Sequence, residues 1–172
     1  LSGGSSETVD LSPLVGSTVS SINDLSNALI EDDSIYLGNN PVSTTSTAEY
    51  NVALGSTALD AITSGDNNVA MGFNSLTKLT AGYENVAIGS NALANDTDGV
   101  NNVAIGTNAM NKANGLQYGV AIGKNALYTC VNACFYNIAI GRDASYANIG
   151  GMYNTAIGHR ALKAASASIL VC

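Results

Sequence analysis

Few side chains in this chain could do acid–base or nucleophilic chemistry, and their spacing does not form a recognisable catalytic set. His159 is the single histidine, and it lies between Gly158 and Arg160. A hydrolase of the triad type needs a nucleophile, a base and an orienting acid. No such grouping surrounds His159 in the sequence. The pattern favours a surface histidine, and we predict that the chain is not an enzyme.

Paired carboxylates could bind a cation. Asp96 and Asp98 lie two residues apart, and Glu31, Asp32 and Asp33 form a run. Calcium is bound by such oxygens, but the acidic residues do not recur from repeat to repeat as a calcium-binding roll requires. One weak cation site at Asp96 and Asp98 stays open. We otherwise predict no metal and no cofactor.

The cysteines do not form a disulfide framework, because there are only three of them. Cys130 and Cys134 lie four residues apart and could pair within a chain, or across chains at a tight axis. A zinc site is excluded, since there is one histidine and no second cysteine pair. We expect a structural role or free thiols rather than redox chemistry.

Five tyrosines lie at or near one recurring turn: Tyr50, Tyr83, Tyr118, Tyr136 and Tyr153. Exposed aromatic rings at such a turn could stack on sugars. The simpler interpretation is that the rings cover a corner of the fold.

These residues must be positioned by a 17-residue repeat, whose central word is Asn-Val-Ala-Ile-Gly, as at 102–106. A fixed period of this length is typical of a solenoid, in which stacked copies share one core. The closing glycines of the eight copies are 17 residues apart, with one step of 18: Gly38, Gly55, Gly72, Gly89, Gly106, Gly123, Gly141 and Gly158. Each glycine suits a corner where the chain takes positive φ.

Within each word, aliphatic residues alternate with a small central residue, which predicts a short strand. We expect the Val and Ile side chains to form the buried face. The small residue would then allow something to pack closely against the other face. It is alanine in seven copies: Ala53, Ala70, Ala87, Ala104, Ala121, Ala139 and Ala156.

An asparagine begins most of the words, and Leu or Met lies four residues after six of the glycines, with Ser145 breaking the row. We predict that the asparagines stack, one per coil, and hydrogen-bond along the stack in a structural role. They are Asn51, Asn68, Asn85, Asn102, Asn137 and Asn154. About eight coils, spaced like neighbouring strands, would make a rod of roughly 40 Å.

The chain divides into four parts. Residues 1–12 read as a linker, and 13–33 as a short helix that is either a coiled-coil neck joining identical chains or a cap on the first coil. The repeat domain covers 34–162, and its extra residue is expected to bulge in a surface loop near 128–134. Residues 163–172 would be a capping strand or a join to a further part.

Composition excludes several partners. Only 11% of the residues are charged, the net charge is −7, and six are Lys or Arg. Nucleic acids and anionic membrane surfaces require clustered basic residues, so neither is expected as a partner. The chain also has no apolar run near the roughly 20 residues that span a bilayer.

The repeated word Asn-Val-Ala-Ile-Gly-x-Asn-Ala-Leu resembles the YadA-like head repeats of trimeric autotransporter adhesins. It is still more similar to a 17-residue variant found in phage tail fibres. The resemblance covers 34–162. It departs from the adhesin heads, whose repeats are usually shorter.

The resemblance implies an all-β, left-handed parallel β-roll and a homotrimer in which the seven alanines let the chains approach. It also implies a structural fibre segment in a virion that attaches to a host-surface glycan or protein, together with other fibre or virion proteins. The alternative is the head of a bacterial adhesin on the outer cell surface. No membrane insertion of the repeats is implied.

Overall fold

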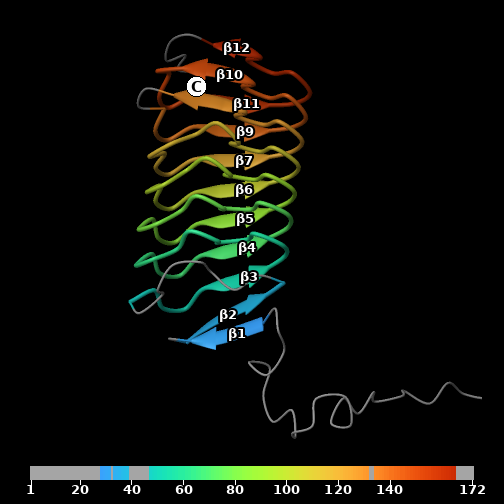
Figure 1. Ribbon diagram of the computed structural model, residues 1–172. Coiled ribbons are helices and arrows are strands. Elements are labelled where there is room, and N and C mark those ends of the chain that lie inside the picture. Colours follow the sequence, from blue (N-terminus) through green and yellow to red (C-terminus); the bar gives the residue numbers. More distant parts are fainter. Residues whose placement is uncertain (1–27, 32, 39–46, 132–133, 166–172) are drawn as a thin grey trace, which may run out of the picture.

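The chain forms a parallel β-solenoid, which the computed structural model describes over residues 28–31, 33–38, 47–131 and 134–165 (Figure 1). All its regular elements in these ranges are strands. The coil makes about seven turns rather than the eight predicted, because eight parallel strands enclose seven complete turns. The all-β solenoid class predicted from the repeat is confirmed.

One strand from each turn stacks into a large sheet. Each word supplies three or four residues, and the register pairs equivalent positions, so that Ala87 lies beside Ala70 and Ala104. One period of the sequence is therefore one turn of the coil. The parallel strands are β2 (Ser34–Leu37), β3 (Val52–Leu54), β4 (Val69–Met71), β5 (Val86–Ile88), β6 (Val103–Ile105), β7 (Val120–Ile122), β9 (Ile138–Ile140) and β11 (Thr155–Ile157).

The first strand corrects the prediction of a helix over 13–33. Strand β1 (Ala28–Glu31) pairs antiparallel with β2 through a tight turn in which Asp33 has a φ of 55°. A short amphipathic helix is marginal in water, whereas pairing satisfies the open edge of the first coil. The predicted linker at 1–12 and the rest of the predicted helix, up to residue 27, lie outside the described residues.

A second, smaller sheet forms only near the C-terminal end. It contains β8 (Thr129–Val131), β10 (Ala147–Ile149) and β12 (Ala164–Ala165), all parallel. Part of the segment expected to bulge as a surface loop is thus a paired strand, while residues 132–133 lie outside the described ones. The tail contributes β12, and 166–172 are not described.

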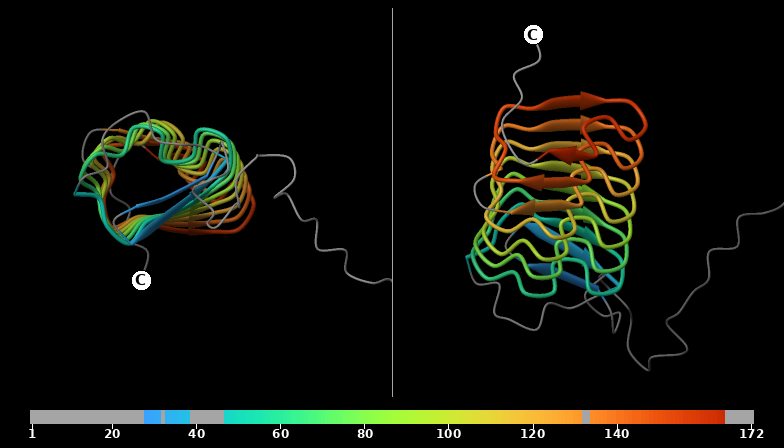
Figure 2. Two further views of the ribbon diagram at one scale, coloured as in Figure 1. Left: turned by 60° about the horizontal axis from the view of Figure 1, so that its bottom comes forward. Right: turned by 90° about the horizontal axis from the view of Figure 1, so that it is seen from above.

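Four residues per turn have left-handed backbone, which closes each coil into the ring seen along the axis in Figure 2. In the turn from 85 to 101 these are Gly89 (φ 130°), Asn91 (57°), Leu93 (50°) and Asn101 (57°). Positive φ is uncommon for residues other than glycine. The same four positions repeat along the array, so the sharp corners stack on one another.

Candidate functional site

The strands of the large sheet bury their central residue and turn the two flanking residues outward. This is the reverse of the predicted orientation, in which Val and Ile formed the buried face. The prediction that the alanines form the trimer contact is therefore wrong. These residues lie inside a single chain, at most 1% exposed, and cannot touch a second chain. They are Ala53, Ala70, Ala87, Ala104, Ala121, Ala139 and Ala156.

The reversal has a simple cause in the opposite wall of the coil. That wall supplies large buried side chains, including Leu59, Leu76, Leu93, Met110 and Leu127. They share one hydrophobic cluster with the alanines. The interior of the coil already holds this row and the buried side chains of Ile62 and Leu79, so the strand that faces them has room only for a small residue.

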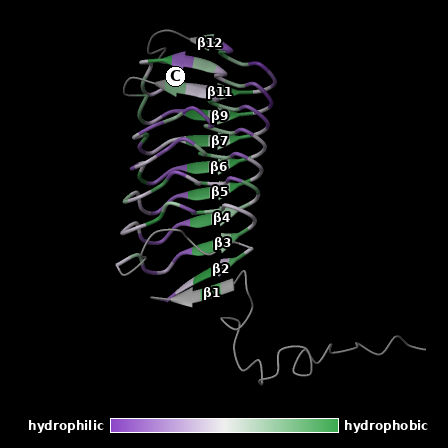
Figure 3. Ribbon diagram, viewed as in Figure 1, coloured by the Kyte–Doolittle hydropathy of each residue, from purple (hydrophilic) through white to green (hydrophobic). Residues whose placement is uncertain are grey.

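The outward residues form two continuous rows, which we name the aliphatic face. In register, the first row runs through Val52, Val69 and Val86, and the second through Leu54, Met71 and Ile88. Figure 3 shows these strands as the hydrophobic part of the coils. The members that are at least 36% exposed are Ile35, Val52, Leu54, Met71, Ile88, Ile122, Ile138, Ile140 and Ile157.

Three of the five predicted tyrosines form a stacked row beside the aliphatic face. Tyr118, Tyr136 and Tyr153 lie on successive coils, with ring centroids 5.0 and 5.1 Å apart and nearly parallel planes. Tyr50 has the same left-handed backbone but lies several coils away, and Tyr83 is one residue out of phase with the row. All five rings are exposed.

The asparagine row lies inside the coil, fully buried, and forms the predicted hydrogen bonds along the stack. Nδ2 of Asn85 donates to Oδ1 of Asn68 (3.0 Å) and to the carbonyl of Gly99 (2.7 Å). Asn102 repeats the pattern with Asn85 (3.0 Å) and Leu116 (2.6 Å). The row satisfies buried backbone groups of the return segment, which is a structural role.

The glycine row forms the predicted positive-φ corners, with φ between 91° and 136°. Successive glycines also touch. A β-carbon on Gly89 would lie 2.7 Å from the carbonyl carbon of Gly106, and one on Gly106 would lie equally close to that of Gly123. Glycine is thus required for two reasons: the positive φ of the corner, and the close approach of the backbone of the next coil.

The two carboxylates of the open cation site do not converge. Oδ1 of Asp96 accepts the backbone N–H groups of Gly115 (2.8 Å) and Gly99 (3.0 Å) inside the coil. Asp98 is exposed and accepts from Thr97 Oγ1. Among the described residues, no group of three or more His, Cys, Asp or Glu side chains could hold a metal ion.

Asp96 stands in a row that is otherwise aliphatic in neighbouring coils, at the position of Ile62 and Leu79. Its Oδ2 is buried and has no hydrogen-bond partner. Burial raises the pKa of Asp96 from 3.8 to about 6, against the lowering effect of its backbone hydrogen bonds. The folded chain therefore binds a proton more tightly than the unfolded chain.

This shift predicts an unusual pH dependence of stability. The pKa of Asp96 in the folded chain lies above its value in the unfolded chain. The contribution of Asp96 to the free energy of unfolding is therefore fully present below about pH 4 and is lost as the pH rises through 6. The free energy of unfolding should fall by about 3 kcal/mol across this range. In denaturant titrations at pH 4 and pH 8, Asp96→Asn should abolish the fall, and Asp98→Asn should keep it. An equal fall in wild type and Asp96→Asn would contradict the assignment.

Cys130 and Cys134 of the long turn are both buried, and no disulfide joins them. Sγ of Cys130 contacts the carbonyl of Cys134 at 3.6 Å, and Sγ of Cys134 contacts that of Asn148 at 3.4 Å. A hydrogen bond with the Cys134 side chain, together with burial, raises the pKa of Cys130. A raised thiol pKa disfavours the reactive thiolate.

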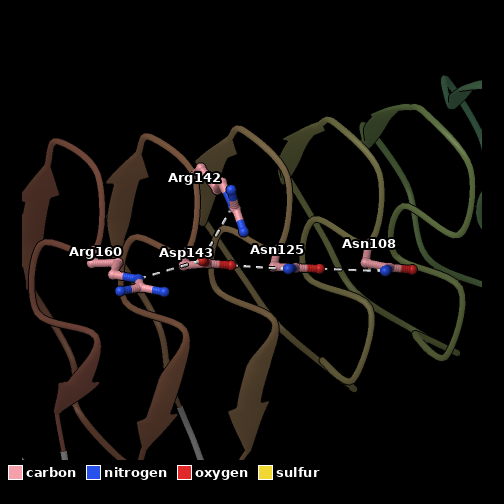
Figure 4. A network of polar contacts seen from close by, with 5 residues as sticks. All are labelled: Asn108, Asn125, Arg142, Asp143 and Arg160. Atoms are coloured by element: carbon pink, nitrogen blue, oxygen red, sulfur yellow. Dashed lines mark hydrogen bonds and ion pairs between the residues drawn. The ribbon is translucent and has the colours of Figure 1, made fainter.

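A polar ladder, which the sequence interpretation did not identify, runs along the corner after the glycines (Figure 4). Nδ2 of Asn108 donates to Asn125 (3.3 Å), whose own Nδ2 donates to Asp143 (2.9 Å). Asp143 then meets Nε of Arg142 at 3.4 Å and Nε of Arg160 at 3.9 Å. Its signal in the sequence was the Asn that lies two residues after four successive glycines, at Asn74, Asn91, Asn108 and Asn125.

Comparison with protein-family models, with curated proteins and with solved structures finds no match to this chain. Within the described part of the chain, none of the secondary-structure elements is a helix of the length and apolarity needed to cross a membrane. A function for this chain is therefore inferred from the geometry of the coil and from the resemblance of its repeats.

Proposed function

We propose that this chain is one subunit of a homotrimeric, non-enzymatic fibre segment, most concretely of a phage tail fibre or appendage that attaches to a host surface. The observation that carries the proposal is the aliphatic face. Monomeric soluble proteins rarely expose contiguous apolar patches larger than a few hundred Å². Nine large aliphatic side chains along one sheet are more than isolated exposed residues would explain.

The proposed subunit contact is the aliphatic face. Residues such as Ile88 and Ile122 lie on the outside of strands that stack along the whole array. A contact along this sheet would be roughly 40 Å long at ordinary strand spacing. The regular spacing lets identical chains match row to row. The number three, and the left-handed winding, come from the resemblance of the repeats.

Attachment to a host-surface glycan or protein is supported by the exposed aromatic row. The rings of Tyr118, Tyr136 and Tyr153 are exposed and stacked, and each lies two residues before a strand of the proposed contact. The virion and other fibre proteins are the proposed setting and partners. A bacterial adhesin head would use the same architecture on a cell surface, and a membrane anchor encoded in the same gene would assign the chain to that class.

The mass of the native particle tests the assembly. Sedimentation or mass photometry should give a particle near 52 kDa, three times the 17.4 kDa of one chain. Ile88→Asp combined with Ile122→Asp should shift the particle to one chain, because burying two unpaired carboxylates in an apolar contact costs several kcal/mol.

Ala81→Asp is the matched control, since Ala81 is exposed on the return segment outside the sheet. It adds a carboxylate of the same kind and should leave the mass unchanged. A folded wild-type monomer of 17.4 kDa would overturn the proposed fibre.

A further inference from the structure

The ionisable residues are divided unevenly along the solenoid axis. Residues 1–98 contain twelve of the thirteen acidic residues and one of the six basic ones, whereas 99–172 contain one acidic and five basic residues. The chain advances along the axis turn by turn, as the colours of Figure 1 show. Eight of these twelve acidic residues lie in the described part of the chain, so the described array has an acidic N-terminal end and a basic C-terminal end, which the net charge of −7 conceals.

The basic residues of the last coils gather on one corner. Lys124 and Arg142 follow the glycines of successive coils, and the N–H of Asp143 donates to the Lys124 carbonyl at 3.0 Å, which places these coils in register. His159 comes next after the following glycine, with Arg160 beside it. We name these four exposed residues the basic ridge. In earlier coils the position after the glycine is uncharged: Ser56, Phe73, Ser90 and Thr107.

The single carboxylate on this corner orients the ridge without neutralising it. Asp143 is nearly buried, and its pKa is held below the usual range first by the Asn125 hydrogen bond and then by Arg142, Arg160 and Lys163. It contacts only the Nε of each arginine, while more than half of each arginine side chain remains exposed. Three nearby cations therefore face one anion, and the guanidinium groups keep donors available to a ligand.

Aromatic rings lie in the rows that follow on the same coils. Tyr128 and Tyr146 stack with centroids 5.1 Å apart, and Lys163 continues their row, because β8, β10 and β12 pair in register immediately after these residues. Nζ of Lys112 lies 5.3 Å from the Tyr128 centroid. Cations beside partly exposed rings suit a ligand that combines negative charge with sugar rings.

We propose that the C-terminal coils bind a linear anionic polysaccharide, sulfated or phosphorylated, along the basic ridge. The charges are spaced by one strand separation, about 4.8 Å, on three successive coils. A linear polymer with regularly spaced anionic groups can contact such a row, whereas the acidic N-terminal coils would repel it. The inference goes beyond fibre assembly and names the ligand class for the proposed attachment.

Dextran sulfate is the probe, and uncharged dextran is its reference. The double variant Lys124→Gln and Arg142→Gln should weaken binding of dextran sulfate about tenfold at 0.1 M salt, and should lower the steepness of the salt dependence. Lys78→Glu lowers the net charge by the same two units at a position away from the ridge, and it should change affinity less than about twofold. Uncharged dextran should not bind with comparable affinity.

Three results would overturn the inference. An equal loss of affinity in the ridge double variant and in Lys78→Glu would mean that binding follows bulk charge. Unchanged binding of dextran sulfate in the double variant Lys124→Gln and Arg142→Gln would show that these two residues are not part of the binding site. Phosphatidylglycerol vesicles bound as tightly as dextran sulfate, with the same dependence on the ridge, would identify a lipid surface instead. Sedimentation of the same samples tests the fibre assembly separately from polysaccharide binding. A monomer that binds dextran sulfate through the ridge would overturn the proposed fibre and leave the proposed binding site standing.

Discussion

Replacing Gly106 by alanine should destabilise the array by about 4 kcal/mol, the sum of backbone strain and overpacking. Gly106 has a φ of 127°, which L side chains rarely adopt, and its added β-carbon would lie 2.7 Å from the carbonyl carbon and 2.8 Å from the carbonyl oxygen of Gly123. Both partners are backbone atoms, so no side chain can rotate away. Denaturant titration at fixed protein concentration measures the loss.

Gly158→Ala separates the two causes. Gly158 ends the same row with a φ of 121°, but an added β-carbon there meets nothing within 4 Å. It should therefore cost only the strain, about 1–2 kcal/mol. Equal costs at Gly106 and Gly158 would show that the close approach of the coils contributes nothing.

The architecture follows from the sequence because one period equals one turn. Equivalent residues such as Val86 and Val103 pair in register, and the insertion of one residue near Cys130 does not disturb the pairing of β7 with β9. A regular spacing of glycines, most of which approach the backbone of the next coil closely, leaves the coil little freedom to slip. Strand type, strand order and the asparagine stack could therefore be predicted.

The orientation of the strands could not be predicted from hydrophobicity, although a second signal was present. Burying Val and Ile is the usual choice, yet the Leu row already fills the narrow interior. Residues two apart on a strand share a face. Asn85 and Ala87 are two apart, so an asparagine stack inside the coil requires alanine inside and Val86 outside. The two-residue spacing between the asparagine and the alanine therefore predicts the strand orientation better than hydrophobicity does.

The candidate binding surfaces were less predictable from the sequence, because they depend on which side chains of successive coils contact one another. The tyrosines of residues 118, 136 and 153 stack, but Tyr83 is displaced by one position, which the approximate spacing concealed. The leucines with left-handed backbone were also unexpected, since Leu93 has a φ of 50° and residues other than glycine, Asn, Asp and His seldom adopt that region. The buried side chain compensates the local strain, an effect visible only in the packed coil.

Asn102→Ala should cost about 4 kcal/mol, because the asparagine side chain connects two neighbouring coils. Its Nδ2 donates to the Leu116 carbonyl at 2.6 Å, and its Oδ1 accepts the N–H of Gly119 at 2.9 Å. Alanine would leave both buried backbone groups without these partners, at about 1–3 kcal/mol each. The cavity left by the amide adds to the loss.

The matched control is Asn114→Ala. Asn114 is exposed, and its Oδ1 accepts from Oγ1 (2.8 Å) and the backbone N–H (3.2 Å) of Thr97, groups that water can reach. Its loss should stay below about 1 kcal/mol. Hydrogen exchange should report the same difference locally, since Asn102→Ala should accelerate exchange at the Gly119 amide and Asn114→Ala should not. Unchanged protection of that amide in Asn102→Ala would mean that another acceptor replaces the asparagine, and that the buried row does not join the coils.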